Sequence, residues 1–317
     1  MKPDLKHMLW VERYRPHKIA DCILPESLKS TFQQFVDDAN VPNLLLAGGP
    51  GVGKTTVAMA MLDELGADYI KINGSLRGGI DTLRNDIESY ASTVSFSGGR
   101  KYVILDEADY LNANSTQPAL RGFIEDYSKS CGFILTCNFK NRIITPLHSR
   151  CSVIEFKIGS KEKAKLASEF MKRCEMILTE EKIEYDKKVL SEVILKHFPD
   201  WRRVLNELQR YSRQAGGKID TGILTQLADF DMKDLIPALK AKDFKLMRKW
   251  VAQNANVDQS VLYRHLYENA YSIIKPDSIP MLVIYLADYQ YKAAFVVDAE
   301  INLAAALTQI MADCEFI

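Results

Sequence analysis

The feature that most constrains this chain is a glycine-rich turn between an apolar run and a helix-forming stretch. Residues 48–55 are GGPGVGKT, which fits the pattern G-x-x-x-x-G-K-[ST]. The apolar run 44–47 directly precedes this turn, and the helix-forming stretch 56–65 directly follows it. In such a strand, loop and helix, backbone N–H groups face phosphate oxygens at the positive end of the new helix. The pattern therefore predicts a nucleoside triphosphate site.

The same pattern gives roles to individual side chains. Lys54 can reach the β and γ phosphates, and the Thr55 hydroxyl can complete the ligand shell of magnesium. Residues 101–106, KYVILD, are typical of a buried parallel strand, and open α/β sheets bind ligands at the carboxyl ends of their strands. At that end, Asp106 is predicted to anchor magnesium, directly or through water. Glu107 is predicted to orient and polarise an attacking water.

Two polar residues farther along the chain indicate how such a site could respond to phosphate. The apolar run 132–137 ends at Asn138, which could hold the attacking water or sense the γ-phosphate beside the Asp106 strand. Arg150 follows in a short turn. Taken alone, such an asparagine is more often a turn former, and such an arginine more often a surface charge. Their combination with the phosphate loop favours the functional interpretation.

Composition limits the possible classes of protein. A chain of 317 residues with 47% hydrophobic content can bury the cores of two or three domains. Lysines and arginines number 41, and so do the acidic residues, whereas a strong nucleic-acid binder usually carries a basic excess. Any DNA contact is therefore expected from a local basic stripe, or from a surface that several subunits build together.

The sequence also predicts a cytoplasmic protein. It has no run of 18 apolar residues that could cross a membrane, and residues 1–7 lack the core of a signal peptide. The six cysteines form no C-x-x-C pair, and His148 with Cys151 gives too few ligands for a zinc site. We expect reduced, mostly structural thiols.

Hydrophobic periodicity divides the chain into three regions. The first, 1–158, alternates strands and helices in the α/β pattern. Its candidate strands are 43–47, 68–72, 101–106, 132–137 and 152–156. From residue 159 the strand pattern disappears, and the predicted helices are 160–178, 186–197, 200–214, 233–253, 257–274, 277–292 and 295–313. The predicted fold class is α/β, with a nucleotide domain at 1–158, a small helical lid at 159–228 and an all-helical tail at 229–317.

Several strings together resemble one family. They are the phosphate loop, WVERYRP at 10–16, DEAD at 106–109, TCN at 136–138 and SRC at 149–151. Their order and spacing are similar to those of clamp-loader subunits in the replication-factor-C branch of AAA+ ATPases, for which SRC is a specific marker. Within that branch, CILP at 22–25 and FPDWR at 198–202 most resemble the large subunits of T-even-type bacteriophage loaders. Cellular relatives usually have glycine where this chain has Pro199.

The resemblance implies roles for further residues. The adenine pocket would be lined by Val11, Glu12, Arg13, Tyr14 and Ile23. The phosphates would be held by Gly51, Val52, Gly53, Lys54, Thr55 and Thr56. Asn138 would be the first sensor, and Arg202 a second sensor that reports the γ-phosphate to the lid. Arg150 would be an arginine finger for ATP bound by the neighbouring subunit, so a lone subunit would be a poor ATPase.

The resemblance also implies partners. Members of the family form five-subunit spirals, and the phage version combines four copies of this type of chain with one different small subunit. ATP and magnesium would open a ring-shaped sliding clamp, and primer–template DNA would trigger hydrolysis and release of the closed clamp. The tail, 229–317, would be the collar that holds the oligomer together. A phage-encoded chain would work in the host cytoplasm.

Contacts with DNA and the clamp have several candidates. The segment 73–81 resembles a family segment that faces DNA, but its basic residue, Arg77, lies one position early. Arg84 and Arg121 are further DNA candidates, and each is equally consistent with a structural ion pair. Contacts with the DNA backbone would be independent of sequence and sensitive to salt. The apolar tip 94–96 is the candidate clamp contact, and core packing is an equally good interpretation of it.

Other classes of function make different demands on the sequence. A branch-migration helicase, the main alternative, would favour a winged-helix C-terminal domain with a β-hairpin, which the predicted elements lack. A small-molecule kinase would need neither the Arg150 turn nor a long helical tail. A non-catalytic subunit would be expected to lack Lys54 or Glu107, and both are present.

Overall fold

The chain folds into two compact units, residues 1–226 and 227–317. The computed structural model describes residues 8–75, 80–95, 98–214, 216–226, 232–254 and 259–317. In the first unit, a five-stranded parallel sheet has the order β2-β3-β4-β1-β5. Its strands are β1 (Leu44–Ala47), β2 (Tyr69–Asn73), β3 (Lys101–Asp106), β4 (Cys131–Cys137) and β5 (Ser152–Glu155). The predicted strands agree with these to within one residue at each end, and the α/β prediction is confirmed.

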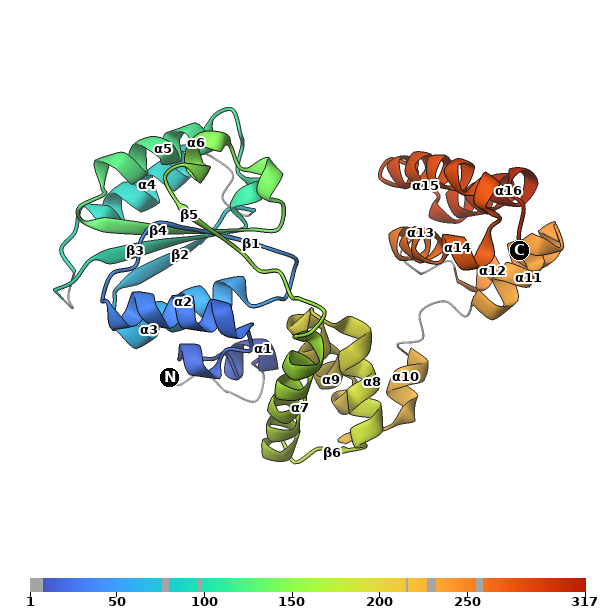
Figure 1. Cartoon of the computed structure of the whole chain (residues 1–317), viewed down its shortest axis with the longest axis horizontal. Helices are drawn as coiled ribbons and strands as arrows, with labels where there is room; N and C mark the ends of the chain where they lie inside the picture. The colour runs from blue at the N-terminus through green and yellow to red at the C-terminus, as the bar shows by residue number, and fades with distance from the viewer. Residues whose placement is uncertain (1–7, 76–79, 96–97, 215, 227–231, 255–258) are drawn as a thin grey trace. The chain divides into compact units, whose positions relative to one another are not determined.

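Helices cover both faces of this sheet (Figure 1). On one face lie α2 (Glu26–Asp37) and α3 (Lys54–Leu65), and on the other lie α4 (Ile80–Ala91), α5 (Thr116–Asp126) and α6 (Thr145–His148). The strands alternate between two cores, so Leu44 and Leu46 pack toward α2 and α3, whereas Leu45 packs toward α4 and α5. With both faces covered, the carboxyl ends of the strands are left to form a site.

Short helical elements connect these layers. They are α1 (Trp10–Arg13), η2 (Ile19–Asp21), η3 (Ala108–Tyr110) and η4 (Lys140–Arg142). The first two belong to an N-terminal segment that precedes the sheet, and η3 and η4 directly follow the carboxyl ends of β3 and β4.

A smaller group of helices completes the first unit. It contains α7 (Lys163–Glu180), α8 (Lys187–His197), α9 (Trp201–Gln214) and α10 (Thr221–Gln226). As expected for a helix start, Asp200 Oδ1 accepts a hydrogen bond of 3.0 Å from the Arg203 N–H. The expectation of no strands beyond residue 159 is wrong, because β6 (Glu184–Tyr185) and β7 (Lys218–Ile219) pair in parallel. Two-residue strands are too short to show an alternating pattern.

The second unit is a helical bundle with its own core. Its elements are α11 (Met232–Lys240), α12 (Phe244–Gln253), α13 (Gln259–Glu268), α14 (Ala270–Ile273), η5 (Pro276–Ser278), α15 (Ile279–Ala293) and α16 (Ala299–Asp313). The helices predicted at 233–253 and 257–274 are each divided into two. The first break occurs because Lys242 has a positive φ of 53° and the Asp243 side chain caps α12 by accepting from the Leu246 N–H.

Three other predictions concern the chain as a whole. The boundary at 158/159 stays a prediction, and the one at 228/229 lies outside the described residues. No helix in the described ranges is both long and apolar enough to cross a membrane. All six cysteines are free and buried. Burial raises the pKa of Cys22 to about 12, which keeps this thiol protonated near neutral pH.

Candidate nucleotide site

The phosphate loop connects the fully buried β1 to α3, which begins at Lys54. Gly51 and Gly53 have φ values of 69° and 95°, which glycine adopts without the strain of a side chain. A Cβ on Gly51 would lie 1.8 Å from Asp200 Oδ1, so only glycine permits this close approach. The start of α9 therefore packs directly against the phosphate loop.

Lys54 joins this loop to β4. Its Nζ donates to the carbonyl oxygens of Gly48 at 2.7 Å and Gly49 at 2.6 Å, and to Asn138 Oδ1 at 2.9 Å. Burial lowers the pKa of Lys54, and neighbouring negative charge, including that of Asp106, opposes this shift. The predicted phosphate-binding lysine and the predicted first sensor are thus in direct contact.

Asp106 lies where three elements meet. Its Oδ1 accepts hydrogen bonds from the Thr55 hydroxyl at 2.6 Å and the Thr136 hydroxyl at 2.7 Å. Its Oδ2 lies 3.8 Å from Lys71 Nζ on β2. The neighbouring oxygens of Thr55 and Asp106 are the hard ligands that magnesium prefers, so the residues present fit that ion.

Glu107 and Asn138 follow the ends of adjacent strands and are held there by fixed polar contacts. Glu107 has the left-handed backbone conformation, with φ 57° and ψ 46°, and its N–H donates to Thr136 Oγ1 at 3.1 Å. Asp109 Oδ2 accepts from the N–H groups of Asn138 at 3.2 Å and Phe139 at 3.1 Å. Unusual backbone conformations of this kind cluster at functional sites.

The sequence assigned no role to Thr136, Lys71 or Asp109. One signal could have indicated Thr136, because residues two apart on a strand face the same side and Thr136 precedes Asn138 by two. Lys71 lies on the neighbouring strand β2, so only the strand order places it beside Asp106.

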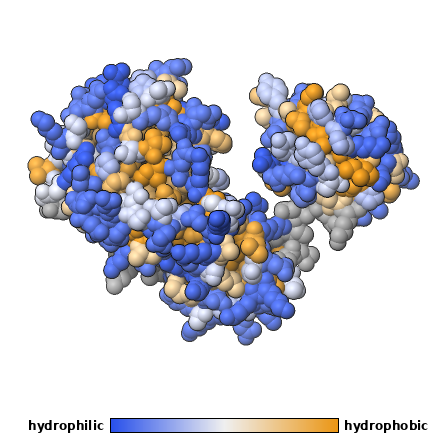
Figure 2. Space-filling model, in the orientation of Figure 1, coloured by the Kyte–Doolittle hydropathy of each residue, from blue (hydrophilic) through white to orange (hydrophobic). Residues whose placement is uncertain are grey.

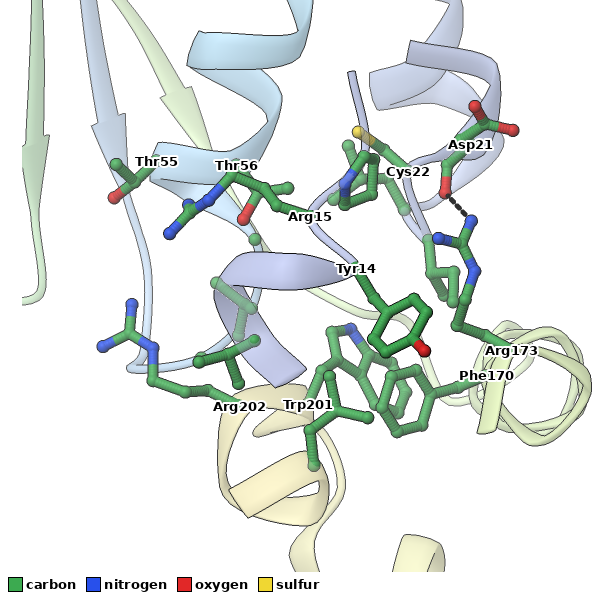
Figure 3. Close-up of a pocket in the computed structure, with 18 of the residues that line it drawn as sticks. Tyr14, Arg15, Asp21, Cys22, Thr55, Thr56, Phe170, Arg173, Trp201 and Arg202 are labelled. Atoms are coloured by element: carbon green, nitrogen blue, oxygen red, sulfur yellow. Dashed lines mark hydrogen bonds between the residues drawn. The ribbon is translucent and has the colours of Figure 1, made fainter. Parts of the chain in front are cut away.

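A pocket lies between the phosphate loop, the N-terminal segment and the lid helices (Figure 3). The predicted residues that line it are Val11, Glu12, Tyr14, Ile23, Gly51, Val52, Gly53, Lys54, Thr55, Thr56 and Arg202. In Figure 3, Thr55, Thr56 and Arg202 lie at one end, whereas Tyr14, Cys22 and Arg173 lie at the other. The phosphate loop and Arg202 at one end suit an anionic group there.

The lid supplies part of the wall that the sequence did not predict. Phe170, Arg173 and Ile177 of α7 line the pocket, and their spacing of three and four residues places them on one helical face. Trp201 of α9 also lines it, with its ring centroid 4.4 Å from that of Phe170. Apolar spacing alone could not separate these residues from ordinary core positions.

Arg13 and Arg150, two of the predicted residues, are not among the described residues that line the pocket. Arg13 Nη1 lies 2.6 Å from Glu181 Oε1, at the end of α7. Arg150 lies outside the described lining of the pocket, where its Nε donates to Glu125 Oε1 at 2.8 Å and its Nη1 to the Pro146 carbonyl at 2.8 Å. The Arg150 hydrogen bond lowers the pKa of the Glu125 carboxyl.

The candidate DNA and clamp contacts have mixed outcomes. Arg77 and Phe96 lie outside the described residues. Arg84 is paired with Glu88 at 2.7 Å, and Arg121 lies 3.8 Å from Glu125. Val94, at the predicted tip, is 89% exposed, so core packing does not explain it.

Comparison with known proteins places these features in a family. Residues 44–158 match the model of the ATPase family associated with various cellular activities, and residues 162–225 match the AAA+ ATPase lid domain of sliding-clamp-loader large subunits. The sliding-clamp-loader large subunit of Enterobacteria phage T4 is 33% identical and covers 99% of this chain and 98% of its own length. This chain belongs to the clamp-loader family of AAA+ ATPases.

Other relatives agree with this family. The large subunit of Escherichia phage RB69 is 35% identical over 86% of this chain and 85% of its own length. A replication factor C small subunit from Sulfurisphaera tokodaii is 31% identical over 96% of this chain and 95% of its own. The solved structure of the branch-migration motor RuvB of Thermotoga maritima matches this structure with a TM-score of 0.51. The match covers 74% of this chain and 80% of RuvB, and the two sequences are 19% identical, so it shows a shared fold alone.

Replacing Thr136 with valine tests the junction at Asp106. Valine keeps the shape but leaves the Glu107 N–H and one Asp106 lone pair without this partner, which costs about 1–3 kcal/mol for a buried group. We expect Thr136→Val to lower the free energy of unfolding by that amount, measured by urea denaturation, and to lower ATP turnover. Thr136→Ser keeps the hydroxyl and is the matched control. Equal stability and turnover in the two variants would contradict the assigned role.

Proposed function

We propose that this chain is an ATPase subunit of a sliding-clamp loader that acts in DNA replication. ATP binding opens the clamp, and primer–template DNA triggers hydrolysis and release of the closed clamp on DNA. The observation that carries the proposal is the contact set at Lys54, Asp106 and Asn138, which joins the phosphate loop to two strand ends beside a lid-lined pocket. The near full-length likeness to clamp-loader large subunits supports this choice among AAA+ activities.

The chemistry follows from the residues at the strand ends. Lys54 would hold the β and γ phosphates in place of the Gly48 and Gly49 carbonyls, and Thr55 and Asp106 would hold magnesium. When bound, magnesium would supply positive charge to stabilise the phosphates during transfer to water. Glu107 orients the attacking water, and Asn138 senses the γ-phosphate beside it. Arg202, at the phosphate end of the pocket, reports the same group to the lid.

Arg150 acts in trans in this proposal. It lies outside the pocket of its own chain, and its ion pair with Glu125 is partly exposed, at 24% and 50% of the two side chains. Exposed ion pairs of this kind contribute little to stability, so Arg150 can exchange Glu125 for the γ-phosphate of a neighbouring subunit. Hydrolysis then depends on assembly.

Assembly is proposed to use the C-terminal unit. Figure 2 shows apolar residues crossing the visible face of this unit. On α15, Met281, Ile284 and Tyr291 are exposed and spaced so that they share one side of the helix, and the exposed Phe295, just after the helix, has its ring centroid 5.1 Å from that of Tyr291. We propose a spiral of four copies with one different small subunit in the host cytoplasm. Arg84 and Arg121 then contribute sequence-independent DNA contacts.

Steady-state ATP hydrolysis, measured against protein concentration, tests the proposed function. The rate per subunit should rise with assembly and rise again when primed DNA, clamp and the small subunit are added. Arg150→Ala should leave ATP binding intact and lower turnover about a thousandfold or more. Lys187→Ala, which loses a partly exposed ion pair with Glu175, is the control and should hydrolyse ATP at the wild-type rate. A turnover rate that does not change with protein concentration, with added DNA or with the loss of Arg150 would contradict the clamp-loader proposal and indicate only a general ATPase.

The α15 surface gives a separate prediction. Ile284→Asp places a charge in the exposed apolar stripe, so it should shift the protein to smaller species in analytical ultracentrifugation. Thermal unfolding should be unchanged because Ile284 is 59% exposed. Lys249→Glu, at an exposed position of α12, is the control. Wild-type assembly by Ile284→Asp would show that this stripe is not a subunit contact.

A further inference from the structure

The N-terminal segment that lines the pocket is tied to the lid by a buried amide. Gln209 of α9 is 4% exposed. Its Oε1 accepts from the Trp10 N–H at 3.1 Å, and its Nε2 donates to the Met8 carbonyl at 3.2 Å. Both polar atoms of one buried side chain thus hold the backbone of the segment just before Val11.

A carboxylate at the end of α7 holds the other end of the same segment. Glu181 Oε1 accepts from the Tyr14 hydroxyl at 2.7 Å and lies 2.6 Å from Arg13 Nη1. Burial and this hydrogen bond raise the pKa of Tyr14, so the phenol stays protonated and remains a donor. A third lid residue, Arg173, donates to the Asp21 carbonyl at 2.8 Å.

The phosphate end of the pocket has a different support. Lys54 and Thr55 bond to Asn138 and Asp106, which follow or end strands of the sheet. By contrast, the polar contacts described for Trp10, Arg13 and Tyr14 beyond their own helical turn run to Gln209, Glu180 and Glu181 of the lid. The segment Trp10–Tyr14 is therefore held by side chains of the lid, whereas Lys54 and Thr55 are held by side chains at the strand ends.

We propose that Gln209 and Glu181 are positioning residues that set the segment Trp10–Tyr14 against the nucleotide base. The inference rests on the proposed function, because it takes the pocket to be the ATP site. A nucleotide that fills both ends then ties the lid to the sheet through its base as well as its phosphates. Loss of Gln209 or Glu181 weakens the part of binding that depends on the base and spares the part that depends on the phosphates.

Competition binding separates these two parts. ATP and inorganic tripolyphosphate each displace a fluorescent ATP analogue from the full chain, and the ratio of their dissociation constants measures the contribution of the nucleoside. For Gln209→Ala we expect the ratio of the tripolyphosphate dissociation constant to the ATP dissociation constant to fall about tenfold, which corresponds to about 1.4 kcal/mol. Gln209→Glu keeps the acceptor for the Trp10 N–H, so it should recover part of the advantage.

Glu181→Ala provides a second variant at a less buried position, where the side chain is 21% exposed, in case Gln209→Ala fails to fold. It should show the same selective loss. Glu180→Ala is the matched control and should behave as wild type. The Glu180 side chain is 55% exposed, and its Oε1 is 4.0 Å from Arg13 Nη2, farther than Glu181 is from the same arginine. Thermal unfolding verifies that each variant is folded.

The outcomes distinguish this inference from the proposed function. Folded variants with the wild-type ratio, or with equal losses for ATP and tripolyphosphate, overturn the positioning role and leave the ATP site intact. A wild-type chain that binds neither competitor overturns the proposed function itself. A selective loss of the ATP advantage in Gln209→Ala and Glu181→Ala, but not in Glu180→Ala, supports the inference.

Discussion

One carboxylate oxygen holds the start of α3 and the ends of β3 and β4 together. Asp106 Oδ1 accepts from Thr55, the second residue of α3, and from Thr136 on β4. Because Thr136 also accepts the Glu107 N–H, three strand or helix ends are fixed relative to one another by two hydroxyls. Buried polar groups are costly unless all are paired, so this junction favours one arrangement of the site. Lys54 and Asn138 add a second connection across the same elements.

The pocket depends on the lid as much as on the sheet. Gly51 accepts the close approach of Asp200, and α7 and α9 contribute Phe170, Arg173 and Trp201 to the wall. A change in lid position therefore alters both the phosphate loop surroundings and the base end. This arrangement suits a protein in which nucleotide binding biases one of two states.

Local sequence patterns predicted where helices and strands lie better than they predicted the breaks within the helices. The five strands were found to within a residue, because buried parallel strands give continuous apolar runs. The divided helices and the β6–β7 pair were missed. A turn at Lys242 and two-residue strands depend on neighbouring packing and leave little periodic pattern.

By itself, the sequence indicated the phosphate loop, the carboxylates at the end of β3 and Asn138 after β4, because each lies at a fixed offset from a strand or helix end. The predicted pocket residues of the N-terminal segment and the lid came from the family resemblance. Only the tertiary structure decided what those residues contact. Trp10 meets Gln209 across 199 residues, and Arg150 turns to Glu125 on a neighbouring helix. Such contacts arise when elements pack together, and no local spacing encodes which distant surfaces will meet.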